Sequence, residues 1–158
     1  MTDESDKLIL NQLAKLQESG KLPIRCVADV MTRDVSSLTP RHSFADAANL
    51  IATRHFRHFL VIEDARLVGV VSDRDVLRGL AGTDNWQGKK IQEFMSVDPI
   101  TVEPDSSLAA ATSKMLSHRI NCLPVVDADA NPCGILTSTD LLKCLEAVLK
   151  SLEDYGCL

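Results

Sequence analysis

Two short stretches of the sequence carry residue types that can bind a polar ligand: GVVSDRD begins at Gly69, and GILTSTD begins at Gly134. Each contains a glycine, two aliphatic residues, a hydroxyl residue and, three positions after the hydroxyl, an aspartate. In both stretches the pattern of an apolar strand changes to that of a helix at the hydroxyl residue. The recurrence of both polar side chains needs an explanation from folding, from binding or from both.

The folding explanation is helix capping. Ser72 with Asp75 matches the capping box, in which a hydroxyl and an acid satisfy N–H groups of the first helical turn, and Thr137 with Asp140 repeats it. The loss of such a cap costs about 0.5–2 kcal/mol. Capping does not explain the glycine, because a glycine inside an apolar strand usually marks the close approach of another group.

The binding explanation uses the same atoms. A helix N-terminus offers free N–H groups and the positive end of the helix dipole, which suit a phosphate. A carboxylate is a good bidentate acceptor for the two hydroxyls of a ribose. A strand glycine would let a flat base approach the backbone. The glycine, the hydroxyl residue and the aspartate at this spacing could therefore bind a nucleoside phosphate. Short motifs, however, often match by chance.

Both stretches belong to a longer internal repeat. A shift of 64 residues places VADVMTRD on IQEFMSVD and Ser43 on Ser107, and one extra residue in the turn DADANPCG makes the shift 65. Such matches indicate a duplicated module whose copies bury their apolar faces together. The expected fold class is mixed α/β (α+β), with two β-α-β-β-α repeats packed as a pseudo-two-fold pair. The first strands are expected at 36–39 and 100–102, and the helices that follow them begin at Ser43 and near Asp105 to Ser107.

The sequence divides into five expected segments. They are an N-terminal helix and lead-in at 1–26, repeat 1 at 27–80, a linker at 81–90, repeat 2 at 91–147 and a C-terminal helix extension at 148–158. The N-terminal helix is predicted over 5–19. The last helix continues to about Tyr155, with an apolar stripe at Leu141, Leu145, Val148 and Leu152. This stripe either covers the chain's own core or forms the seam of a dimer.

Composition narrows the class of protein. Hydrophobic residues make up 45% and charged residues 25%, and no apolar run approaches the ~20 residues of a membrane span. The acidic N-terminus lacks the basic start of a signal peptide, so a cytoplasmic protein is expected. The net charge of −5 argues against non-specific binding to nucleic acid or to a membrane surface. Five cysteines without a C-x-x-C pair predict free thiols.

No constellation of catalytic or metal-binding residues stands out, so the protein is expected not to be an enzyme. His55 and His58 straddle the exit from a helix to a strand and have no third ligand spaced nearby, which disfavours a metal site. A cysteine nucleophile needs a histidine and an orienting partner. The sequence also lacks a Gly-rich phosphate loop.

The doubled unit resembles a tandem pair of CBS domains, the cystathionine-β-synthase-type module that is also called a Bateman module. The resemblance covers residues 27 to about 147 and rests on DVMTRDVSSLTP and EFMSVDPITVEPD, on ATRHFRHFLVIED and LSHRINCLPVVD, and on the two opening stretches. It implies a regulatory module that binds AMP, ADP, ATP or S-adenosylmethionine in clefts between the copies. No effector domain is recognised, so the output is expected to pass through a homodimer or an effector protein.

The resemblance also implies site residues. The aspartates would hold the ribose, the hydroxyl residues would approach the phosphate, and backbone near the first and middle strands would line the base. Carried over, this gives Ser37, His58, Leu60, Ser72 and Asp75 in copy one, and Thr101, Cys122, Pro124, Thr137 and Asp140 in copy two. The alternative is a ligand-free structural or interaction module, in which these motifs are only helix caps and the long last helix makes the contacts.

The two copies differ in charge. Residues 27–80 carry seven arginines and seven acidic residues, whereas residues 91–145 carry three basic and seven acidic residues. A phosphate is therefore expected to prefer copy one, through Arg57, His58 and Arg74, unless these arginines only solvate helix ends. Copy one has Asp73-Arg74 and Phe59-Leu60 where copy two has Ser138-Thr139 and Leu123-Pro124, so the two sites are expected to differ.

Overall fold

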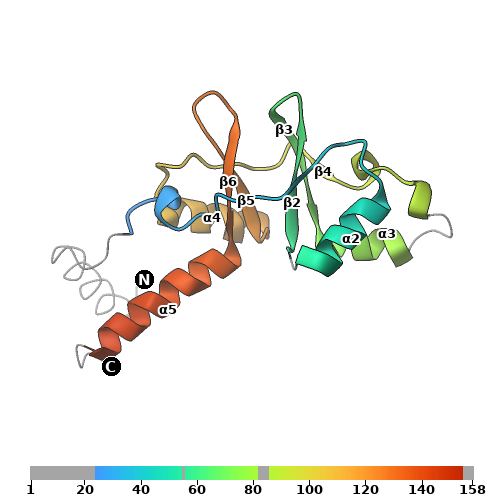
Figure 1. Cartoon of the computed structure of the whole chain (residues 1–158). Helices are drawn as coiled ribbons and strands as arrows, with labels where there is room; N and C mark the ends of the chain where they lie inside the picture. Colours follow the sequence, from blue (N-terminus) through green and yellow to red (C-terminus); the bar gives the residue numbers. More distant parts are fainter. Residues whose placement is uncertain (1–23, 55, 82–85, 155–158) are drawn as a thin grey trace.

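The computed structural model describes residues 24–54, 56–81 and 86–154 and has the α+β architecture that the repeat predicts (Figure 1). The helix predicted over 5–19 lies outside the described residues. Along the chain the elements are η1 (Val27–Asp29), β1 (Ser37–Leu38), α2 (Phe44–Arg54), β2 (His58–Glu63), β3 (Arg66–Ser72), α3 (Asp73–Ala81), η2 (Trp86–Gly88), η3 (Ile91–Glu93), β4 (Ser96–Val97), α4 (Leu108–His118), β5 (Cys122–Val126), β6 (Pro132–Thr137) and α5 (Ser138–Asp154).

An antiparallel hairpin forms the centre of each copy: β2 pairs with β3, and β5 pairs with β6. Asp64 and Ala65, which join β2 to β3, both have positive φ angles, as a tight hairpin turn of matching twist requires. The two hairpins lie side by side in the middle of the molecule (Figure 1). Leu60 and Val70 of copy one pack there with Ile135 of copy two, so the copies share a small apolar layer.

The first long helix of each copy begins at the predicted serine. Ser43 and Asp46 form a reciprocal capping box at the start of α2, since the Ser43 N–H donates to Asp46 Oδ2 at 2.7 Å and the Asp46 N–H donates to Ser43 Oγ at 3.2 Å. Ser107 caps α4 by accepting a hydrogen bond from the N–H of Ala110 at 3.1 Å. The prediction of both helix starts is confirmed.

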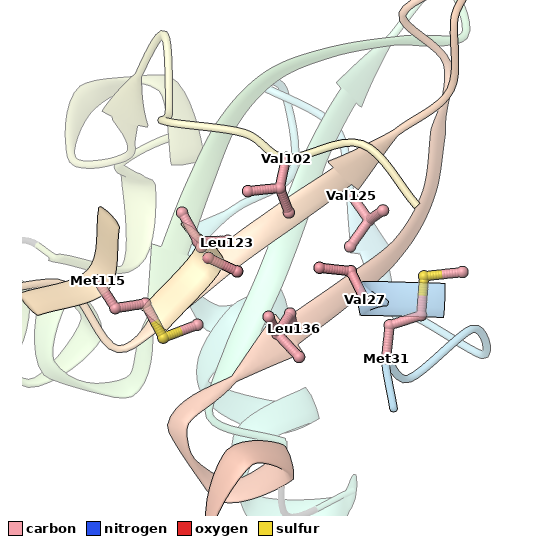
Figure 2. Close-up of a cluster of buried hydrophobic side chains, with 8 residues drawn as sticks. Val27, Met31, Val102, Met115, Leu123, Val125 and Leu136 are labelled. Carbon is pink, nitrogen blue, oxygen red and sulfur yellow. The ribbon is translucent and has the colours of Figure 1, made fainter. Parts of the chain in front are cut away.

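The lead-in of copy one packs in the core of copy two. Figure 2 shows Val27 and Met31 among side chains of copy two, including Leu123 and Leu136. The backbone of η1 is fastened there by the Val27 N–H, which donates to the Ser106 carbonyl at 2.9 Å. Residues at the start of the first sequence repeat are therefore part of the second structural core.

The exchange is reciprocal. Ile91 of η3 is fully buried in the core of copy one, in the same cluster as Phe44 and Phe59. β4 then pairs antiparallel with β3, and the bridge between Thr32 and Ile135 is the equivalent pairing in copy two. This exchange explains why neither copy is expected to fold without the other.

The exchanged segments also account for the strand glycines. A Cβ atom on Gly69 would lie 2.7 Å from Sδ of Met95, and one on Gly134 would lie 2.9 Å from Sδ of Met31. In each case a backbone carbonyl oxygen of the exchanged segment is 3.0 Å from the same point. The suggestion that the glycines admit a flat base is therefore wrong, because a methionine fills that space.

The first strand differs between the copies. β1 pairs parallel with β2 through Ser37 and Leu38, but the strand expected at 100–102 is reduced to one bridge between Val102 and Val125. Pro124 stands where copy one has Leu60, and proline has no N–H to extend a ladder. The carbonyl of Thr101 instead accepts a hydrogen bond from Lys114 Nζ at 3.0 Å.

The last helix, α5, extends away from the hairpins to Asp154 (Figure 1), and Tyr155 lies outside the described residues. Its leucines are divided: Leu141 packs against the core of copy two, whereas Leu142, Leu145 and Leu149 are exposed. The side chain of Leu152 lies outside the description. None of the helices in the described ranges is long and apolar enough to cross a membrane.

Candidate ligand-binding cleft

A cleft of about 1160 Å³ lies between the two copies. Both strand-to-helix junctions line it, the one that carries Ser72 and Asp75 and the one that carries Thr137 and Asp140. Val70 and Ile135, from the apolar layer between the hairpins, are also part of the lining. The two copies of the recurring motif therefore open on the same cavity, which the sequence alone could not establish.

Both aspartates cap the helices that follow them. Asp75 Oδ2 accepts hydrogen bonds from the Ser72 N–H at 2.9 Å and from Ser72 Oγ at 2.6 Å. Asp140 Oδ2 accepts from the Thr137 N–H at 2.8 Å and from Thr137 Oγ1 at 2.6 Å. The folding explanation is thus correct for α3 and α5. The cap engages one oxygen of each carboxylate.

The second oxygen of each carboxylate has a different partner. Asp75 Oδ1 lies 3.3 Å from Nη1 of Arg78, within the same helix. Asp140 Oδ1 lies 3.5 Å from Oγ1 of Thr32, which comes from the exchanged lead-in. Asp140 is buried, whereas Asp75 is only partly buried. The two junctions therefore cap their helices alike, but the second carboxylate oxygen has a different partner at each, and the two aspartates differ in exposure.

Most of the site residues predicted from the resemblance and from the charge distribution lie on the cleft. Its lining includes Arg57, His58, Ser72, Arg74, Asp75, Cys122, Pro124, Thr137 and Asp140. The lining does not include Ser37, Leu60 or Thr101. Leu60 is fully buried against the other hairpin, while Pro124, at the equivalent position, borders the cleft.

The structure adds cleft residues that the sequence reading did not select. Arg78, Arg119 and Lys143 contribute positive charge, and Thr32 and Ser96 come from the exchanged segments. Arg78 and Lys143 match under the same 65-residue shift as the motif aspartates, so the repeat contained a signal for them. Thr32 and Ser96 also match each other, under the 64-residue shift, as a pair of hydroxyl residues. The repeat could not place them on the cleft, because the exchange between copies is a tertiary feature.

His58 and Cys122 occupy equivalent positions and titrate differently. Burial lowers the pKa of His58 below its ordinary value of 6.5, against the opposing effect of the Asp73 and Asp75 carboxylates. Burial raises the pKa of Cys122 to about 12, and the negative charge of Asp75 adds to that shift. At neutral pH both side chains are therefore uncharged on the wall of the cleft.

The remaining thiols and acids form no evident metal centre. Cys26, Cys122, Cys133 and Cys144 are free thiols, and Cys157 lies outside the described residues. Burial raises the pKa of Cys133 and of Cys144, which makes these thiols poor nucleophiles. Over the ranges that the structure describes, no group of three or more His, Cys, Asp or Glu side chains could hold a metal ion.

Comparison with known families identifies the class of protein. The family model of the CBS domain matches residues 27–82 and 91–147. The chain therefore belongs to the CBS domain family and contains two such domains in tandem. The CBS domain-containing protein YhcV of Bacillus subtilis is 34% identical over 116 residues, which cover 73% of this chain and 81% of that protein.

Solved structures of CBS pairs have the same fold. The CBS domain pair of protein MJ0100, in complex with 5′-methylthioadenosine and S-adenosyl-L-methionine, superposes with a TM-score of 0.72 at 26% identity and covers 79% of this chain and 98% of that one. CBSX2 of Arabidopsis thaliana, in complex with AMP, gives a TM-score of 0.70 at 30% identity and covers 78% of this chain and 97% of that one. These CBS pairs bind adenosine compounds.

Several curated relatives are much longer proteins. Homoserine O-acetyltransferase of Methanohalobium evestigatum is 32% identical over 121 residues, which are 76% of this chain and 24% of that protein. The uncharacterized protein MJ1232 of Methanocaldococcus jannaschii is 30% identical, and the match covers 40% of its length. The chain therefore spans between about a quarter and two fifths of the length of these relatives.

Proposed function

We propose that this chain is a non-enzymatic regulatory module that binds an adenosine-type ligand in the cleft between its two CBS domains. The ligand classes that fit are AMP, ADP, ATP and S-adenosylmethionine. The aspartates of the two junctions would hold ribose hydroxyls, and Ser72 and Thr137 would lie near the 5′ substituent. Binding would be reported through a change of shape or assembly to a homodimer partner or an effector protein of the cytoplasm.

The observation that carries this proposal is that the helix cap engages only one of the two carboxylate oxygens at each junction. The cap engages Oδ2 of Asp75 and of Asp140, so Oδ1 can accept a ribose hydroxyl while the helix stays capped. Both residues line a cleft large enough for a nucleotide, because ligand pockets commonly have volumes of about 300–1,000 Å³. Capping and binding therefore do not compete for the same atom.

A thermal-shift panel with AMP, ADP, ATP and S-adenosylmethionine tests the proposal. A ligand at a hundred times its dissociation constant adds about 2.7 kcal/mol to the free energy of unfolding, which is a rise of roughly 5–10 °C for a chain of this size. We expect at least one compound to give such a rise, and Asp75→Ala or Asp140→Ala to abolish it. No rise with any of the four would contradict the proposal.

Asp46→Ala is the matched control for both aspartates. Asp46 forms the same capping box with Ser43, but it is exposed and is not part of the cleft lining. Its loss should lower the melting temperature as the other two losses do and leave the ligand-induced rise unchanged. If Asp46→Ala also removed the rise, the loss of a cap would explain the result, and a role in binding ribose would not follow.

The exposed leucines of α5 favour a second function, as an interaction module. Leu142, Leu145 and Leu149 are 63%, 51% and 41% exposed and recur at helical spacing on one side. Replacing Leu145 and Leu149 with Gln should leave the melting temperature unchanged within a few degrees. If light scattering showed the same monomeric mass for the parent chain and this variant, an interaction between copies through α5 would be excluded.

A further inference from the structure

We infer that the two halves of the cleft select ligands by charge: the Asp75 half takes adenosine nucleotides with a 5′-phosphate, and the Asp140 half takes adenosine compounds without one. The inference rests on the proposed function and assigns a ligand class to each half. Arg78 is the residue that decides the difference. Thr32 takes the corresponding place at Asp140.

At Asp75, a ribose hydroxyl must displace the guanidinium of Arg78. The free oxygen of Asp75, Oδ1, faces this guanidinium at 3.3 Å, and the side chain of Arg78 is 78% exposed. An exposed ion pair of this kind is weak, so a ribose hydroxyl can replace the guanidinium at little cost. The displaced guanidinium then lies in solvent about one helical turn from the ribose, free to pair with another group.

The displaced guanidinium can pair with a phosphate of the ligand. A guanidinium pairs with a phosphate through two parallel hydrogen bonds, which are stronger than bonds between neutral groups. A nucleotide with a 5′-phosphate therefore replaces the ion pair that it breaks. A ligand without phosphate forms no such pair with Arg78, so it binds this half more weakly than a nucleotide does.

At Asp140, a ribose hydroxyl would replace Thr32. There the free oxygen faces a neutral hydroxyl, that of Thr32 at 3.5 Å. A ribose hydroxyl replaces it with a donor of the same kind, and no charge is left without a partner. In the part of the chain that the structure describes, Lys143, the counterpart of Arg78, makes no ion pair with Asp140. This half therefore gains nothing special from a phosphate.

The surrounding charges agree with this assignment. Three cleft positions of copy one carry arginine, at Arg57, Arg74 and Arg78. Under the repeat, their counterparts in copy two are Asn121, Thr139 and Lys143. Two arginines are thus replaced by neutral side chains and the third by a lysine, which cannot form a bidentate pair. Asp73 also lines the cleft and offsets one arginine, whereas its counterpart Ser138 is neutral, and Asp98 and Arg119 cancel each other. With the motif aspartates counted, the lining of copy one keeps one net positive charge and that of copy two keeps none.

Titration calorimetry of the full chain with two probes, ADP and 5′-methylthioadenosine, tests the inference. Arg78→Gln should weaken ADP binding by roughly tenfold or more, because a charge-assisted pair is lost, and should leave the affinity for 5′-methylthioadenosine within about twofold. Asp140→Ala should remove the binding of 5′-methylthioadenosine and spare that of ADP. Arg66→Gln, on an exposed residue outside the cleft lining, is the control and should change neither affinity.

A second measurement needs no variant. The affinity for ADP should fall as the salt concentration rises, because screening weakens contacts between charges, while the affinity for 5′-methylthioadenosine should stay constant. If Arg78→Gln weakened both probes equally, or if Asp75→Ala abolished the binding of both, the assignment of ligand classes would be overturned and the proposed function would survive. If neither probe bound the parent chain, the assignment of ligand classes would fail, and the thermal-shift panel would decide the proposed function separately.

Discussion

The two strand-to-helix junctions, Ser72–Asp75 and Thr137–Asp140, cap their helices in the same way. They differ in the groups that they meet on the side of the cleft. From the helix, each carboxylate accepts from the backbone N–H and the hydroxyl of its partner, with distances that agree within 0.1 Å. From the cleft, one carboxylate meets a guanidinium and the other a threonine hydroxyl. The duplication has therefore kept what the fold needs and varied what a ligand would touch.

The exchanged segments show the same division. Met31 lies against Gly134 and Met95 lies against Gly69, and both contacts are equally tight. The apolar core contacts are likewise matched, with Val27 and Ile91 fully buried in opposite copies. Features that hold the copies together are therefore symmetric.

The exchange of core residues should produce the largest effect. Ile91→Ala removes a fully buried side chain and is expected to cost about 2–5 kcal/mol of unfolding free energy. Hydrogen exchange should then increase mainly in copy one, over 44–81, although Ile91 belongs to the second sequence repeat. Val27→Ala should do the reverse and open copy two. Val97→Ala is the control, since Val97 is 63% exposed. Opening confined to the mutated residue's own repeat would contradict the exchange.

The strand glycines should show a smaller, matched effect. Gly69→Ala and Gly134→Ala each force a Cβ against a methionine and a carbonyl oxygen, which should cost about 1–3 kcal/mol in chemical denaturation. Gly88→Ala provides the control, because a Cβ at Gly88 meets nothing within 4 Å. A cost at one strand glycine only would show that the two exchanged segments are not held alike.

The caps should be equivalent when no ligand is bound. Asp75→Ala and Asp140→Ala are each expected to lower the free energy of unfolding by about 0.5–2 kcal/mol, because each removes two strong hydrogen bonds from a helix start. Denaturation curves of the two variants and of Asp46→Ala should therefore be similar. A variant as stable as the parent chain would argue that the cap at that junction contributes nothing to folding.

The smallest effect separates His58 from Cys122. The pKa of His58 is lowered in the folded protein, so between that lowered value and 6.5 the unfolded chain binds more protons than the folded one. The free energy of unfolding should therefore fall as the pH drops below 6.5. His58→Asn should reduce this fall, whereas Cys122→Ala should not change it, since the pKa of that thiol is raised to about 12. Thermal melts between pH 5 and pH 7.5 measure the difference, and equal slopes for all three chains would contradict it.

The duplication, the α+β repeat, the helix starts and the capping role of Ser72 and Thr137 could all be predicted from the sequence. These follow from local patterns, because a capping box or an amphipathic stripe is formed by residues a few positions apart. The resemblance carried by the motifs was sufficient to identify the family. The charge difference between the copies was also visible in the sequence, before any distance was known.

How the two copies combine became known only from their packing in three dimensions. The strand glycines pointed to a close neighbour. The pattern alone could not select Met95, which follows Gly69 by 26 residues, or Met31, which precedes Gly134 by 103 residues. The same holds for Thr32 beside Asp140, a contact between positions 108 residues apart. Contacts of this kind depend on how two apolar surfaces pack, which no local periodicity encodes. The cleft, and the difference between its halves, are consequences of that packing.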